Sequence, residues 1–128
     1  VPDWSGMRHA IGGGPFLVKD GQPYVDTKVQ GFSHFPEQER TARSALGIRA
    51  DGTVLMVVAE RGRDGVVGVT LPQLSHAMLA LRARDAMNLD GGKSTQLAVQ
   101  GRTVYAAVPG AAPVSTGLYL VPNRLAAK

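Results

Sequence analysis

Short apolar runs separated by turn sequences dominate the first part of the chain and predict a β-hairpin. Phe16-Leu17-Val18 and a second run that ends at Tyr24-Val25 flank the dipeptide Asp20-Gly21. Asp-Gly between two apolar runs is a strong hairpin signal because both residues tolerate positive φ. Residues 26–41 then show neither helical nor strand periodicity. We therefore expect a long surface loop there, and loops of that size are often functional.

The same pattern predicts two further hairpins and a final strand. Residues 44–49 and 54–59 flank another Asp-Gly turn. Because 54–59 is a nearly continuous apolar run, we expect this strand to be buried on both faces. Residues 96–99 and 103–107 form the third predicted hairpin, and the apolar run 117–121 predicts a last strand.

One helix interrupts the hairpins, and its start is marked clearly. Thr70 as the N-cap with Gln73 three residues later forms a capping box, and Pro72 is tolerated in the first turn. One apolar stripe that would face the sheet contains Leu71, Leu74, Met78 and Leu81. We expect the helix to end near Ala83 and residues 84–89 to form a return strand.

Hairpins around a single helix indicate an α+β fold, with a mainly antiparallel mixed sheet and one amphipathic helix packed on it. The chain has 128 residues, of which 44% are hydrophobic, so it forms one domain or less. No apolar run reaches the about 18 residues that a transmembrane helix needs. We expect no membrane span.

Charge and composition exclude several kinds of site. The net charge is +4 with scattered basic residues, and aromatics are only 5%, which argues against a nucleic-acid platform. No cysteine is present, so disulfides, thiolate metal sites and cysteine nucleophiles are excluded. His9, His34 and His76 lack the spacing of metal ligands, and we predict neither a metal nor a cofactor.

The segment Asn88-Leu89-Asp90-Gly91-Gly92-Lys93-Ser94-Thr95 is the richest in candidate chemistry. An acidic residue at a strand end, followed by two glycines and two hydroxyls, can expose backbone amides to an anion or a sugar. A simple glycine-rich turn, with Asp90 accepting amide hydrogen bonds, is an equal alternative. A P-loop is rejected because it needs a glycine where Met87 stands and a helix afterwards. Arg43, where the long loop meets a strand, either holds a phosphate or is an ordinary surface arginine.

Three motifs in this order resemble the phosphodiester glycosidase family. They are Ala10-Ile11-Gly12-Gly13-Gly14-Pro15, Ala42-Arg43-Ser44-Ala45-Leu46-Gly47 and the segment 88–95 described above. This family includes the enzyme that uncovers mannose 6-phosphate by removing N-acetylglucosamine from a phosphodiester. The resemblance implies hydrolysis of the bond between the anomeric carbon of a sugar and a phosphodiester, in a glycan or an exopolysaccharide.

The resemblance also implies roles for individual residues. Arg43 would bind the phosphate, and Asp90 would act at the sugar or in acid/base catalysis. The implied substrate contacts are Ser44, Asn88, Gly91, Gly92, Lys93, Ser94 and Thr95. Ser94 and the amides of Gly91 and Gly92 would orient the substrate.

Two departures from the family pattern qualify this hypothesis. Lys93 stands where the family usually has a third glycine, and its side chain would either block the sugar or add a cation. Family domains also begin with an upstream Asn-Gly segment that has no counterpart here. We therefore expect residues 1–128 to be the C-terminal portion of a single domain. The missing N-terminal segment, or another protein chain, would cover the sheet edge.

Two other functions fit the same sequence. One is a non-catalytic cell-envelope or exopolysaccharide-binding module that keeps the fold, for which Lys93 is the motivating residue. The other is a structural subunit of a surface assembly. A secreted or cell-envelope location follows from the family's usual setting.

Overall fold

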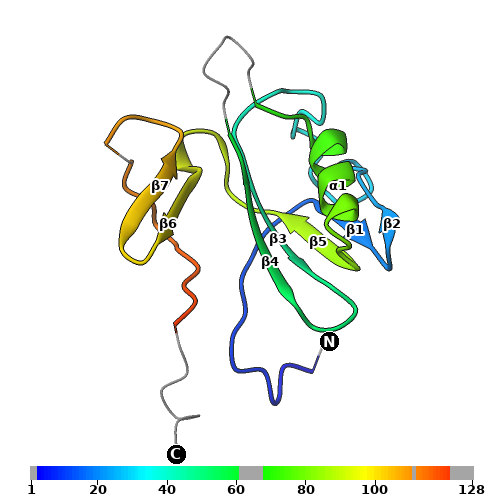
Figure 1. Ribbon diagram of the computed structural model, residues 1–128. Helices are drawn as coiled ribbons and strands as arrows, with labels where there is room; N and C mark the ends of the chain where they lie inside the picture. Colours follow the sequence, from blue (N-terminus) through cyan, green and yellow to red (C-terminus); the bar gives the residue numbers. More distant parts are fainter. Residues whose placement is uncertain (1–2, 61–67, 111, 122–128) are drawn as a thin grey trace, which may run out of the picture.

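The computed structural model describes residues 3–60, 68–110 and 112–121 of the chain. A five-stranded sheet with the order β2-β1-β5-β3-β4 carries helix α1, and a separate two-stranded sheet is formed by β6 and β7 (Figure 1). The elements are β1 (Phe16–Lys19), β2 (Gln22–Pro23), β3 (Arg43–Ile48), β4 (Val54–Ala59), α1 (Leu71–Ala80), β5 (Asp85–Asn88), a 3-10 turn (Gly92–Ser94), β6 (Gln96–Val99) and β7 (Arg102–Ala106). Every strand pair is antiparallel, and the predicted α+β fold is confirmed.

All three predicted hairpins are present. Asp20 and Gly21 have φ angles of 49° and 74°, the positive values that the Asp-Gly signal requires. β3 and β4 pair continuously, from Arg43 opposite Ala59 to Ile48 opposite Val54. The sequence therefore determines these hairpins locally, through turn chemistry and alternation.

Helix α1 begins as its capping box predicts. The Gln73 amide donates to Thr70 Oγ1 at 3.3 Å, and the Thr70 amide donates to Gln73 Oε1 at 3.0 Å. The helix ends at Ala80, earlier than predicted, and Arg82 just beyond it has a positive φ of 61°. Leu81 therefore follows the helix instead of extending its apolar stripe, and it is 39% exposed.

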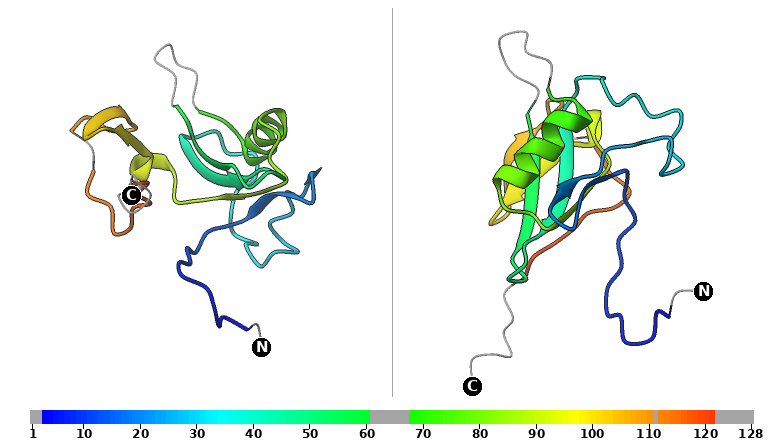
Figure 2. Two further views of the ribbon diagram at one scale, coloured as in Figure 1. Left: turned by 60° about the horizontal axis from the view of Figure 1, so that its bottom comes forward. Right: turned by 90° about the vertical axis from the view of Figure 1, so that its right-hand side faces the viewer.

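The core lies between α1 and the main sheet, and α1 covers one face of that sheet (Figure 2). Its fully buried members are Leu17, Val18, Ala45, Leu71, Leu74, Met78, Ala83 and Ala86. Gly47 allows the close approach, because a Cβ there would lie 2.6 Å from Met78 Cε. The absence of a side chain at Gly47 thus lets Met78 of α1 reach the surface of β3.

Two expectations about strands were wrong. β4 is an edge strand, and its residues are half-buried, or exposed in the case of Val54, instead of buried on both faces. α1 makes its main contacts with β1, β2 and β5, and Leu55, Val57 and Ala59 of β4 are only partly buried against the core. Residues 117–121 form no strand and are exposed, and within the described chain no backbone hydrogen bond joins them to a strand edge. Apolar alternation alone does not make a strand without an edge to pair with.

The described residues contain no helix long and apolar enough to cross a membrane.

Candidate active site

The start of β3 and the end of β5 lie side by side, which unites two of the sequence motifs. In the antiparallel pairing Ala45 is opposite Asn88, so the loop after β5 passes the residues that precede β3. The Leu89 amide donates to the Ser44 carbonyl at 2.9 Å, and the Gly92 amide donates to the Ala42 carbonyl at 2.7 Å. The loop with Asp90 is thereby fixed against the strand with Arg43.

Gly91 and Gly92 permit this contact. A Cβ on Gly91 would lie 3.0 Å from the Ala42 carbonyl oxygen, and Gly92 has a φ of 58°. The Gly91 amide donates to Asp90 Oδ1 at 2.9 Å, as the glycine-turn alternative predicted, and the Gly92 amide is bound to Ala42. Both amides already have acceptors, so these glycines act through close approach and not by presenting donors to a ligand.

The glycine cluster of the first motif packs on the other side of β5. The Gly14 amide donates to the Asn88 carbonyl at 2.7 Å, and Asn88 Nδ2 donates to the Gly14 carbonyl at 3.0 Å. A Cβ on Gly13 would lie 2.9 Å from the same Asn88 carbonyl oxygen. All three motifs therefore meet around Asn88, although they are far apart in the sequence.

A cavity of about 560 Å³ opens where the motifs meet. Gly13 and Gly14 form one wall, and Phe32, Phe35 and Glu39 come from the long loop before β3. Arg43, Asn88, Asp90, Gly91 and Gly92 also line this cavity, which we call the charged cavity. It contains both residues predicted to be catalytic.

Arg43 is a buried cation, only 2% exposed. Its Nη2 donates to the Glu39 carbonyl at 2.8 Å, its Nε reaches the Val69 carbonyl at 3.4 Å, and its Cζ lies 5.4 Å from the centre of the Phe35 ring. Within the described residues no carboxylate forms an ion pair with it. Burial lowers the pKa of Arg43, and the charge of Glu39 acts in the opposite direction. An arginine remains protonated under such conditions, and its other donors are left for a ligand.

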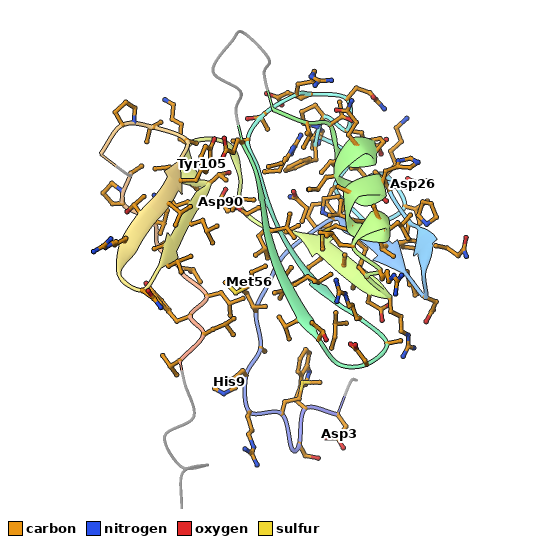
Figure 3. The ribbon with its side chains drawn as sticks, viewed as in Figure 1. Asp3, His9, Asp26, Met56, Asp90 and Tyr105 are labelled. Atoms are coloured by element: carbon orange, nitrogen blue, oxygen red, sulfur yellow. The ribbon has the colours of Figure 1, made fainter. Side chains whose placement is uncertain are left out.

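Asp90 is exposed at the end of β5, between the main sheet and hairpin β6–β7 (Figure 3). It lines the charged cavity and also a second cavity of about 620 Å³. The second cavity includes Ser44, Leu46 and Met56 from β3 and β4, with Ser94 and residues 114–119. We call it the open-face cavity, because it lies on the side of β3 opposite α1. Arg43 and Ser44, as neighbours in one strand, point to opposite faces.

The other residues predicted to contact the substrate differ in whether they line a cavity. Asn88 is 2% exposed, lines the charged cavity and has an Oδ1 atom without a hydrogen-bond partner. Thr95 is fully buried with an unpaired Oγ1, and it lines neither of the two cavities. Lys93 is exposed and also lies outside both. Its side chain is therefore not placed to block either one.

Comparison with known proteins decides the family. Residues 1–121 match the sequence profile of the family described as phosphodiester glycosidase. The chain belongs to this family. The recognition that rested on three short motifs is confirmed.

Two solved structures resemble this member of the phosphodiester glycosidase family. The catalytic domain of zebrafish N-acetylglucosamine-1-phosphodiester alpha-N-acetylglucosaminidase, auto-inhibited by its pro-peptide, matches 74% of the chain with a TM-score of 0.60 and 28% identity. A hypothetical protein from Synechocystis matches 73% of the chain with a TM-score of 0.66 and 34% identity. The uncharacterized SPbeta prophage-derived protein YomE of Bacillus subtilis is 29% identical over 77% of the chain. The matched regions make up 34%, 17% and 15% of these proteins respectively.

One wall of the charged cavity could hardly be predicted from the sequence. Phe32, Phe35 and Glu39 lie in a loop without periodicity, and only the unusual length of that loop pointed to a function. The loop is held by Glu37, whose Oε1 accepts from both the amide and the hydroxyl of Thr27 at 2.7 Å. Within the described residues no group of three or more His, Cys, Asp or Glu side chains is arranged to hold a metal ion.

Proposed function

We propose that this phosphodiester glycosidase domain hydrolyses a sugar-1-phosphodiester, with the phosphate bound at Arg43 and the anomeric carbon close to Asp90. The observation that carries the proposal is the pairing of these two residues on one cavity. Arg43 is buried without a carboxylate partner in the described chain, and Asp90 lines the same cavity. Buried charges are normally paired, so an unpaired one suggests that the partner is a ligand.

The proposed phosphate contact depends on the guanidinium group. The backbone carbonyls of Glu39 and Val69 and the ring of Phe35 fix its orientation. Arginine offers five N–H donors in a planar fork that matches phosphate oxygens, and the two carbonyls occupy only part of this set. The site therefore has a preoriented anion contact before a ligand arrives.

Asp90 is suited to the sugar end of the substrate. Cleavage of a glycosidic bond develops positive charge at the anomeric carbon, which a nearby carboxylate stabilises. Only Oδ1 of Asp90 has a hydrogen-bond partner among the described residues, the amide of Gly91, so Oδ2 is free to face the sugar. The phosphodiester leaving group is a weak base and needs little help from a general acid.

Asn88 lines the same cavity as Arg43 and Asp90, where its side chain would orient the substrate. Its Nδ2 is held by the carbonyls of Gly14 and Leu89, at 3.0 Å and 2.8 Å, which leaves Oδ1 as an unused acceptor. An unpaired buried acceptor is costly, and a sugar hydroxyl or amide would satisfy it. The resemblance to the zebrafish enzyme adds support for an N-acetylglucosamine phosphodiester as the first substrate to test.

The test is release of sugar from a synthetic N-acetylglucosamine-1-phosphodiester by the natural protein. We expect Asp90→Asn, which keeps the acceptor for Gly91, to lower the rate by about 100-fold to 1,000-fold. Asp51→Asn is the matched control, because Asp51 lies in the β3–β4 turn outside both cavities and its contact to Thr53 is also kept. Normal turnover by Asp90→Asn would refute the role of Asp90. Binding without turnover by the unmodified protein would favour the non-catalytic module.

A further inference from the structure

The charged cavity carries an unequal set of charges. Among its described lining residues the ionisable side chains are Glu39, Arg43 and Asp90. Carboxylates therefore outnumber cations in a site that we propose binds phosphate. A second carboxylate beside the anion contact has no role in the proposed function, and nothing in the sequence motifs includes Glu39.

Glu39 is attached directly to the anion contact. Its backbone carbonyl accepts from Arg43 Nη2 at 2.8 Å, so the two residues cannot separate without breaking that bond. Glu39 is an exposed residue that lines the cavity, its charge opposes the lowering of the Arg43 pKa by burial, and within the described chain it has no ion pair. An anion bound at Arg43 would therefore experience the attraction of the guanidinium and the repulsion of Glu39 together.

These opposed charges affect the substrate and the product differently. A phosphodiester carries one negative charge, whereas a phosphomonoester carries close to two above its second pKa of about 6. In the proposed hydrolysis the water oxygen bonds to the anomeric carbon, and the bond from that carbon to the phosphate oxygen breaks. The electron pair stays on the phosphate and the water gives up a proton to the solvent, so the products are the free sugar and the phosphomonoester. The additional charge would arise next to Glu39.

We infer that Glu39 selects monoanionic phosphodiesters over dianionic phosphomonoesters and promotes release of the monoester product. This inference rests on the proposed phosphate contact at Arg43. Its physical basis is that the attraction of Arg43 and the repulsion of the carboxylates both grow with the charge of the ligand, and two carboxylates, Glu39 and Asp90, line the cavity with one cation. Glu39 is thus a specificity-determining residue that the family motifs do not include.

The test compares two small ligands that differ in charge. Dissociation constants for dimethyl phosphate and methyl phosphate are measured by calorimetry at about pH 8 and about pH 5, at constant ionic strength. The unmodified protein should prefer dimethyl phosphate at about pH 8, and the preference should narrow at about pH 5, where methyl phosphate is mostly monoanionic. Glu39→Gln should lower the dissociation constants of both ligands at about pH 8, and the factor for methyl phosphate should be about fivefold larger than the factor for dimethyl phosphate.

Two further variants separate the possible failures. Glu60→Gln removes the same charge from an exposed residue outside both cavities and should leave the ratio of the two constants unchanged. If Glu39→Gln also leaves that ratio unchanged, the selectivity inference is overturned and the phosphate contact stands. If neither ligand binds, or if Arg43→Ala binds both ligands as tightly as the unmodified protein does, then Arg43 does not bind phosphate. The inference about Glu39 is then overturned as well.

Discussion

The two faces of strand β3 have different surroundings and line different cavities. On the face toward α1, Arg43, Ala45 and Gly47 are buried, and the residues around them form both the core and the charged cavity. On the opposite face Ser44 and Leu46 are only half-buried and line the open-face cavity. Adjacent positions of one strand therefore line two different cavities, and the face that packs against α1 is also the face that carries the charged cavity.

The difference between the two faces shows which contacts a buried guanidinium group requires. On the α1 side Arg43 finds two backbone carbonyls and an aromatic ring, which replace part of its lost hydration. The open-face cavity offers uncharged polar and apolar side chains, together with Asp90 at the edge that both cavities share. Its uncharged polar residues include Ser44, Ser94, Gln96, Ser115 and Thr116. Asp90 is therefore the link between the faces, and Arg43 belongs to one of them alone.

The largest expected effect concerns stability, and it compares two leucines across the sheet. Leu74→Ala in α1 should lower the free energy of unfolding by about 2–5 kcal/mol, because the side chain is 1% exposed in the core. Leu46→Ala, on the open face, should cost less than about 1.5 kcal/mol, because Leu46 is only half-buried. Urea unfolding of both variants measures the two changes.

The leucine comparison can also fail in an informative way. If Leu46→Ala in the natural protein costs as much as Leu74→Ala, then the open face is covered there, by another segment or by another chain. The half-exposed state of β3 and β4 would then not describe the natural protein, and the difference between the faces would lie in chemistry alone.

A smaller effect is expected for neighbouring residues on β3. Arg43→Lys should weaken dimethyl phosphate binding about tenfold, because lysine has a point charge and loses the planar fork and the ring contact. Ser44→Ala should change it less than twofold, about 0.4 kcal/mol, since Ser44 lines only the open-face cavity. Calorimetry on both variants measures the two changes in the dissociation constant. Equal losses would mean that the anion site spans both faces.

Local rules explain which parts of the fold could be predicted from the sequence. The Asp20-Gly21 turn and the Thr70–Gln73 capping box depend on residues close in the chain, and both are confirmed. Burial of β4 and pairing of residues 117–121 depend on which element lies next to them. Composition and periodicity do not contain that information, so both expectations were wrong.

The candidate site shows the same division. Arg43 and Asp90 were identified because the family resemblance rests on several motifs that are far apart in the chain. The structure brings these two residues onto one cavity. The faces of Ser44 and Ser94 could not be assigned before the register of β3 and β5 was known. Glu39 was missed because the loop that carries it has no periodicity to orient its side chains.

The smallest expected effect concerns acid and the long loop that lines the charged cavity. Hydrogen bonds from the Thr27 amide and hydroxyl lower the pKa of Glu37 below its ordinary value of 4.5. A lowered pKa means that the ionised form stabilises the fold. This contribution is complete above the ordinary value and is lost as the pH falls through the folded value. The same residue's carbonyl accepts from the Leu71 amide at 3.0 Å, so the loop is tied to α1 as well.

Amide hydrogen exchange tests this tie. Between about pH 6 and about pH 3 the protection of the Thr27 amide should fall, because protonated Glu37 is a weaker acceptor. The Gly52 amide, which donates to the Arg49 carbonyl in the β3–β4 turn, is the internal reference. Glu37→Gln should show low and pH-independent protection at Thr27. Should Thr27 stay as protected at about pH 3 as at about pH 6, the carboxylate does not hold the loop, and the aromatic wall of the charged cavity is positioned by packing and by backbone hydrogen bonds such as that from Leu71 to Glu37.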